Sequence, residues 1–313
     1  RKENLNNFLS FKKIGKYKLI ILFSFFSYLV IFIKKFFNVK IISIDSFIEI
    51  SKNQGFHFWM TGTIHKIPKI KKKVNDYVNM KNVFHKKDKI FQLYPLNISK
   101  GFLKKREKKI IYASTFEIRA NNLSKNIWKK KKNFLLNKFD NLDKQIFWRN
   151  SLTKKLNDEK KFLVYRDLKS LQRSKIIENI YKNNSHNISL FGQNWNRIIN
   201  KKFDNINHNE LKKLYKDNIC LDLGSKCGSL TLYPRSIQII ENGGLLLQLK
   251  QSDSQIIFGK YEKLFTFTSF KDLNLKLKRL LNDTNYYYRL VNKQFHIFKN
   301  SYKKIEKQLD EIF

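Results

Sequence analysis

Short apolar runs alternate with amphipathic stretches through the second half of the chain, which is the pattern of strands and helices in α/β proteins. The predicted strands, within residues 161–268, are "KFLVYR", "NISLFG", "NICLDLG", "GLLLQLK" and "KLFTFT". The predicted helices are residues 170–183, 208–217, 234–243 and 269–283, with a further helical tail over residues 284–313. Because the apolar runs are unbroken, the strands suit a sheet covered on both faces. The pattern therefore predicts a doubly wound parallel sheet.

The first half has a weaker pattern of the same kind. Strands are predicted in residues 38–47, in "KIFQLYPL" and in residues 108–119, and residues 121–161 have little pattern. A chain of 313 residues is long for a single core. We expect two Rossmann-like α/β domains, residues 1–150 and 151–313, facing a cleft. Because the chain begins at Arg1 rather than Met, a truncated first domain is one of the alternatives that we consider.

One apolar segment, Leu19–Ile33, has fifteen apolar or small residues between two lysines. This is shorter than the roughly 20 residues that cross a bilayer. We predict a helix buried in the first domain, and a helix lying in the membrane surface remains the alternative. No cleavable signal peptide is expected, because no small-residue cleavage site follows the segment.

The net charge of +39 would usually indicate nucleic acid or an anionic membrane as a partner. Lys, Asn, Ile, Phe and Tyr are abundant together, as expected for a very AT-rich genome, so much of the surface lysine needs no functional explanation. No nucleic-acid-binding motif accompanies the charge. The two cysteines, Cys220 and Cys227, are interpreted as free thiols of a reducing compartment, and their spacing matches no common zinc site.

An ordered set of motifs in residues 162–301 resembles the carboxyl-terminal domain of GT-B glycosyltransferases, in particular the glycosyltransferase group 1 proteins similar to the spore-maturation protein CgeB. The set consists of Gly192 and Trp195 in "LFGQNW", a helix that ends in Leu-Tyr at Tyr215, and then Arg235 and Gly243 around the next helix. Arg173 also matches an arginine of that family. The resemblance implies a donor site for a nucleotide-diphosphate sugar in the second domain.

The residue types at these positions suit a diphosphate. Open α/β sheets bind such ligands beyond the carboxyl ends of their strands, at helix amino termini. In the loop "GSKCGSLTLYP", glycines allow close approach, Ser225 and Ser229 offer hydroxyl groups, and Arg235 would neutralise the diphosphate as the sugar leaves. Neither a metal nor another cofactor is then required, and no D-x-D carboxylate pair occurs in the chain.

Two positions depart from the family. A glutamate that holds the donor ribose is expected three residues after the arginine, where this chain has Gln238, and Glu241 stands where the family has a small residue. Gln can still hydrogen-bond a hydroxyl group, without the added strength of a charge. A non-catalytic homologue that binds a nucleotide sugar is therefore an alternative.

Several of these residues also have structural interpretations. Gly243 and Gly244 are expected to end a helix by a left-handed cap, and Trp195 to be packed in the core. Arg173 is expected to be a solvated helix residue. For Arg235, beside a proline at a predicted helix start, we favour phosphate contact.

The catalytic base, if the enzyme inverts the anomeric centre, is expected on the first domain across the cleft. The candidates are His57, His65 and Glu117. We therefore expect a metal-independent transferase that moves a sugar to a glycan or lipid-linked acceptor. It would be cytoplasmic, either free or at the inner face of the plasma membrane, where basic residues favour peripheral association with anionic lipid. A nucleic-acid-binding protein is the least favoured alternative.

Overall fold

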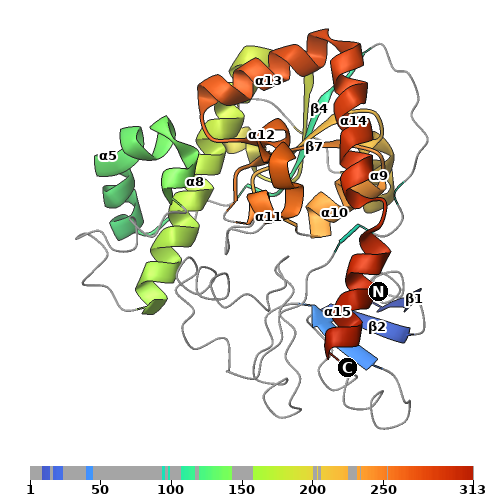
Figure 1. Cartoon of the computed structure of the whole chain (residues 1–313). Coiled ribbons are helices and arrows are strands. Elements are labelled where there is room, and N and C mark those ends of the chain that lie inside the picture. Colours follow the sequence, from blue (N-terminus) through green and yellow to red (C-terminus); the bar gives the residue numbers. More distant parts are fainter. Residues whose placement is uncertain are drawn as a thin grey trace.

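The computed structural model describes residues 9–14, 17–23, 40–44, 94–95, 98, 107–116, 120–142, 158–199, 203, 206–224, 231–232, 234–251 and 253–312. Within them a five-stranded parallel sheet forms the centre of the α/β fold (Figure 1). Its strands are β4 (Ile110–Ala113), β5 (Ile188–Phe191), β6 (Ile219–Asp222), β7 (Leu245–Leu249) and β8 (Thr266–Phe267).

The strands lie in the order β5-β4-β6-β7-β8. The chain steps from β4 to β5 in one direction and then returns past β4 to β6. Because parallel crossovers are right-handed, the helices of these two connections cover opposite faces of the sheet. The predicted parallel, doubly wound sheet is confirmed in this part of the chain, whereas a second Rossmann-like domain remains a prediction.

The membership of the sheet differs from the prediction at one strand. The run "KFLVYR" is helical and belongs to α8 (Asp158–Asn184), whereas β4, which we expected in the first domain, pairs with both β5 and β6. The run is short and apolar, and periodicity alone does not separate a buried strand from a buried helix. The sheet thus includes a strand from before the predicted boundary near Ser151.

The helices after β5 agree with the predicted stretches. They are α9 (His208–Tyr215), α10 (Pro234–Glu241), α13 (Phe270–Asn282), α14 (Thr284–Phe298) and α15 (Ser301–Ile312). Shorter turns are α11 (Ser254–Phe258), α12 (Glu262–Phe265), η2 (Trp195–Arg197) and η3 (Gly259–Tyr261). Before α8 lie α5 (Asn122–Asn137) and η1 (Phe139–Leu142), in the section that had little pattern.

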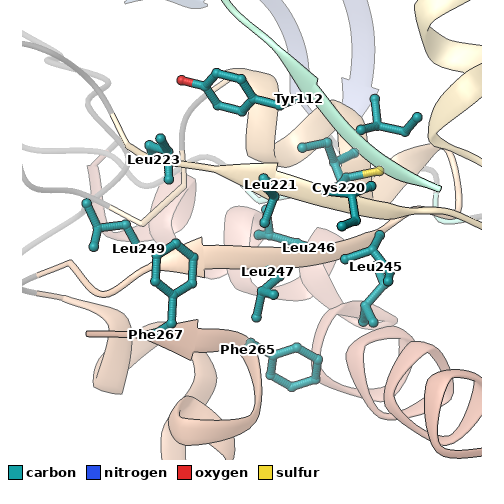
Figure 2. Close-up of a cluster of buried hydrophobic side chains, with 14 of the residues drawn as sticks. Tyr112, Cys220, Leu221, Leu223, Leu245, Leu246, Leu247, Leu249, Phe265 and Phe267 are labelled. Carbon is teal, nitrogen blue, oxygen red and sulfur yellow. The ribbon is translucent and has the colours of Figure 1, made fainter. Parts of the chain in front are cut away.

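The main core fills both faces of β6 and β7. Figure 2 shows Leu221 and Leu223 beside Leu245, Leu247 and Leu249, with the strand arrows pointing toward Leu223 and Leu249. All residues of β6 and β7 are buried, as expected for unbroken apolar strands. A second, smaller cluster holds α5 and η1 against the first half of α8.

A separate three-stranded sheet contains β1 (Leu9–Ile14), β2 (Tyr17–Phe23) and β3 (Lys40–Ile44). The start of the segment Leu19–Ile33 is therefore strand rather than helix, because β2 pairs antiparallel with β1 and parallel with β3. Residues 24–33 lie outside the described residues, as does most of the predicted strand "KIFQLYPL". Among the described helices, none has the length and apolar character needed to cross a membrane.

Candidate functional site

The carboxyl ends of β4 and β6 are the point where the strand order reverses. In doubly wound sheets the crevice beyond such a point is the usual place for a ligand. Two arginines distant in the sequence, Arg173 from α8 and Arg235 from α10, reach the end of β6. They contact consecutive residues, Leu223 and Asp222, so their guanidinium groups approach the same end of one strand.

Arg173 is buried, with 6% of its surface exposed, and its Nε atom donates to the Leu223 carbonyl at 3.3 Å. The prediction of a solvated helix residue was wrong, because the second half of α8 packs on the sheet rather than facing solvent. The Leu223 carbonyl takes one of the guanidinium donors, and an anion at this end of β6 would be a suitable partner for the others.

Arg235 lies in the first turn of α10, directly after Pro234, and its side chain is 33% exposed. Its Nη1 atom is 3.9 Å from the Asp222 Oδ1 atom. At that distance Asp222 does not hold the guanidinium in a close bidentate pair, and the amino terminus of α10 adds a partial positive charge nearby. Arg235 therefore lies at the helix start, as predicted, and its contact with phosphate stays a prediction.

Asp222 is a site residue that the sequence analysis missed. Its side chain is buried, and its carboxylate accepts from the Gly224 amide at 3.0 Å and from Gln248 Nε2 at 3.2 Å. The signal was present in "NICLDLG", since an aspartate inside an otherwise apolar strand needs buried partners. Asp222 lies beside Arg235 and fixes the start of the loop that follows β6.

The end of that loop is held by a second set of buried polar contacts. The Asp253 Oδ1 atom accepts from the Thr231 amide at 2.8 Å and from its hydroxyl group at 2.6 Å, and Gln248 Nε2 donates to the Thr231 carbonyl at 2.6 Å. Ser236 donates to the same carbonyl at 3.0 Å, which ties the loop end to α10. These contacts position the helix that carries Arg235. Ser225 and Ser229 lie outside the described residues.

Gly192 and Trp195, which the resemblance places at the donor site, make structural contacts. Gly192 has φ +111°, and a Cβ atom there would lie 2.5 Å from the Ser114 carbonyl oxygen. Trp195 is buried, donates from Nε1 to the same carbonyl at 2.6 Å, and packs against Tyr112 and Phe116. Both residues thus join the loops after β5 and β4, in agreement with the packing interpretation of Trp195.

Gly243 and Gly244 lie at the opposite end of α10 from Arg235. Their amides donate to the carbonyls of Ile240 and Ile239 at 3.2 Å and 2.9 Å, the two bonds of a Schellman cap, and Gly243 has φ +74°. The predicted cap is confirmed. Because β7 starts just after them, these glycines lie at the amino edge of the sheet, as does Glu241 at the end of α10. The structure does not bring them together with Arg235.

Gln238, which stands where the family has glutamate, lies half-buried on α10. Its Nε2 atom is 3.5 Å from Nε2 of His208, the first residue of α9. Partial burial and the nearby charge of Lys212 lower the pKa of His208 below its ordinary value. An uncharged imidazole beside the amide follows, and Gln238 remains near enough to the surface to contact a ligand.

The three base candidates, His57, His65 and Glu117, lie outside the described residues. In the part of the chain that is described, no group of three or more His, Cys, Asp or Glu side chains is arranged to hold a metal ion. Compared with known proteins, the chain matches no family model, and no curated protein matches it by sequence.

Proposed function

We propose that the protein is a GT-B glycosyltransferase that moves a sugar from a nucleotide-diphosphate donor to a glycan or lipid-linked acceptor without a metal ion. The observation that carries the proposal is the convergence of Arg173 and Arg235 on consecutive residues at the end of β6. Two permanent positive charges at a topological switch point suit a diphosphate, whose negative charge increases as the sugar leaves.

The roles follow from the environments of the two arginines. Arg173, buried and rigid, would bind the ground-state diphosphate, since its guanidinium is already desolvated before the ligand arrives. Arg235, one-third exposed and 3.9 Å from Asp222, has freedom to turn from that carboxylate toward the phosphates. Asp222 would then act as a positioning residue, because it touches Arg235 rather than the donor.

A ligand screen tests the proposal. The purified full chain is heated with UDP-, GDP-, ADP- and CMP-linked sugars, first without metal and then with magnesium. A donor at about 100 times its dissociation constant stabilises a folded protein by roughly 2.7 kcal/mol, a readily measured shift in Tm. A metal-independent shift with one nucleotide class supports the proposal. No shift with any of these donors contradicts it.

The presence of Gln238, where the family has glutamate, favours a second candidate, a homologue that binds a nucleotide sugar without transferring it. A neutral amide holds a ribose hydroxyl group less strongly than a carboxylate does. Hydrolysis or transfer assays with the donor found in the screen separate the two: sugar release indicates an enzyme, whereas binding without turnover under all acceptor conditions indicates the second candidate.

A further inference from the structure

The end of α13 and the start of α14 bring two arginines onto one tyrosine ring. The guanidinium carbon of Arg279 lies 3.8 Å from the centroid of the Tyr286 ring, and that of Arg289 lies 5.2 Å from it. Both arginines are exposed and Tyr286 is half-buried, so the ring holds the two guanidinium groups at the surface. Figure 1 shows α13 and α14 meeting at the upper right of the fold.

A second ring of the same kind lies further along α14. The Lys293 Nζ atom is 4.0 Å from the centroid of the Tyr261 ring in η3, and the Lys260 Nζ atom is 5.3 Å from it. With 3.6 residues per turn, Tyr286, Arg289 and Lys293 project from one side of α14, within an arc of about 60°. The two rings and their cations therefore form one surface. We call it the arginine–tyrosine surface, and its residues are Lys260, Tyr261, Arg279, Tyr286, Arg289 and Lys293.

The positive charge of this surface is not neutralised by acids of the described residues. Two nearby acids, Glu262 and Asp272, pair with lysines outside the surface at 3.1 Å and 2.7 Å. Asp283 caps the start of α14, where its Oδ1 atom accepts from the Tyr286 amide at 2.8 Å. Within the described part of the chain no ion pair joins any of the four cations to a carboxylate. These cations therefore remain available to an anionic partner.

The use of arginine distinguishes this surface from the general excess of lysine. Ten of the 64 Lys and Arg residues are arginine, and two of the ten contact Tyr286. A guanidinium group is planar, whereas an ammonium group is a point charge. At 3.8 Å from the ring centroid, the Arg279 group is close enough to stack on Tyr286. Its outer side then offers a plane to another flat group, such as a base of a single strand.

We infer that the arginine–tyrosine surface binds single-stranded nucleic acid, with a base stacked on the Arg279 guanidinium and backbone phosphates at Arg289 and Lys293. No large apolar side chain of α14 is exposed, so this helix has nothing to insert into a bilayer. A phosphate polymer without bases would leave the guanidinium plane unoccupied. The sequence shows no motif for this surface because its residues come from three elements. The inference goes beyond the proposed transferase, whose two arginines lie elsewhere.

Fluorescence anisotropy of the full chain tests the surface with two labelled 12-nucleotide probes. One is single-stranded DNA of mixed sequence, and the other is an abasic strand with the same number of phosphates. Three variants are compared with the parent: R279Q/R289Q, R279K/R289K, which keeps the charge without the planar groups, and a control, K129Q/K130Q, which removes two exposed lysines of α5. Circular dichroism and Tm show whether each variant keeps the parent's fold. Flotation with vesicles of phosphatidylglycerol and phosphatidylcholine measures lipid binding.

The parent should bind the strand with bases at least fivefold more tightly than the abasic strand. R279Q/R289Q should weaken binding at least tenfold and R279K/R289K severalfold, with the control close to the parent. Equal binding of the two probes would overturn the inference, and this comparison needs no variant to fold. An equal loss in the control, full affinity in R279K/R289K, or variants that lose vesicle binding but keep strand binding would also overturn it. The donor screen uses other ligands, so the two proposals fail separately.

Discussion

The two edges of the five-stranded sheet use their buried polar groups in different ways. At the amino edge, Gln294 of α14 accepts from the Leu246 amide at 2.9 Å and donates to the Gly244 carbonyl at 2.8 Å. Nearer the start of the same helix, the Tyr287 hydroxyl group donates to the Asn218 carbonyl at 3.2 Å. Because β8 is too short to pair with the start of β7, the side chain of Gln294 takes the place of a neighbouring strand.

At the carboxyl edge, polar side chains have hydrogen-bonding capacity that their contacts within the described residues do not use. Arg173 donates to one backbone carbonyl, and Arg235 stands 3.9 Å from Asp222. In the described part of the chain the buried Oε1 atom of Gln251 accepts no hydrogen bond. Buried groups with unused donors or acceptors cost stability, so a protein keeps them where another role requires them. Helix α14 therefore closes the amino edge of the sheet, and on the proposed function the polar groups at the carboxyl edge serve a ligand.

The largest expected effect concerns a residue at the carboxyl edge whose contacts are structural. Gly192→Ala should lower the free energy of unfolding by about 3 to 5 kcal/mol, because it combines a strained positive φ with a clash against the Ser114 carbonyl. Urea unfolding measures the loss. The matched control is Gly259→Ala, with φ +56°, ψ −137° and no atom within 4 Å of the new Cβ atom, which should cost about 1 to 3 kcal/mol from backbone strain alone.

Equal losses in Gly192→Ala and Gly259→Ala would show that close packing does not explain Gly192. Donor affinity of the folded fraction should be unchanged in both variants. A selective loss of donor affinity in Gly192→Ala would instead support the ligand contact that the resemblance implies. The proposed ligand-binding edge would then include the end of β5.

At the amino edge, Gln294→Leu should destabilise the protein by about 2 to 4 kcal/mol, since it leaves a buried amide and a buried carbonyl without partners. The unfolding transition in urea measures the effect, with the exposed Gln255→Leu as control, expected within about 0.5 kcal/mol of the parent. Nucleotide-sugar affinity, measured below the transition, should not change. A loss of affinity equal to the loss of stability would remove the distinction between the two edges.

Substitution of the two arginines should give the opposite of the Gln294→Leu result, with lower donor affinity and little change in stability. Arg173→Met and Arg235→Gln should each weaken donor binding by about 1.5 to 3 kcal/mol, the scale of a hydrogen bond to a charged group. Arg173→Met should leave stability within about 1 kcal/mol, because a buried charge and one hydrogen bond are removed together. Titration calorimetry measures the affinity, and Arg289→Gln, an exposed arginine on α14, is the control. Unchanged affinity in both variants would refute the proposed site.

The order of elements after β5 could be predicted from the sequence because each strand there is an unbroken apolar run between amphipathic helices. The positions of β4 and the start of α8 could not. β4 joins the sheet between β5 and β6, and such pairing across distant segments leaves no local signal. Val164, Tyr165 and Leu168 are buried against α5, whereas later residues of α8 pack on the sheet, and a helix covered on two sides has no amphipathic period.

At the candidate site, Arg235 could be predicted because a proline and a glycine-containing loop mark the helix start beside it. The burial of Arg173 could not be predicted, since it depends on which part of α8 lies over the end of β6. Asp222 was predictable in principle from its place in an apolar strand. The glycine motifs were found, but their residue types alone do not separate close packing from ligand contact, and for Gly244 the neighbouring atoms, Cys220 Sγ and the Tyr215 carbonyl oxygen, explain the glycine.

The smallest expected effect concerns Gln238. In the parent, the lowered pKa of His208 means that the folded state resists protonation more than the unfolded chain does. The free energy of unfolding should therefore decline slightly as the pH falls below about 6.5, and only slightly because His208 is largely exposed and only partly desolvated. Gln238→Glu places a carboxylate beside His208, so the pKa of His208 should rise relative to the parent.

An NMR titration of the imidazole signals measures that change, with His208→Gln assigning the signal. If Gln238 also faces the donor, the same Gln238→Glu substitution should tighten nucleotide-sugar binding by about 1 kcal/mol, the gain from a charge-assisted hydrogen bond. A shifted His208 with unchanged donor affinity would place Gln238 outside the donor site. A His208 signal unaffected by the substitution would show that the two side chains are not in contact. Tighter binding would extend the ligand-binding edge from the first turn of α10 to its second.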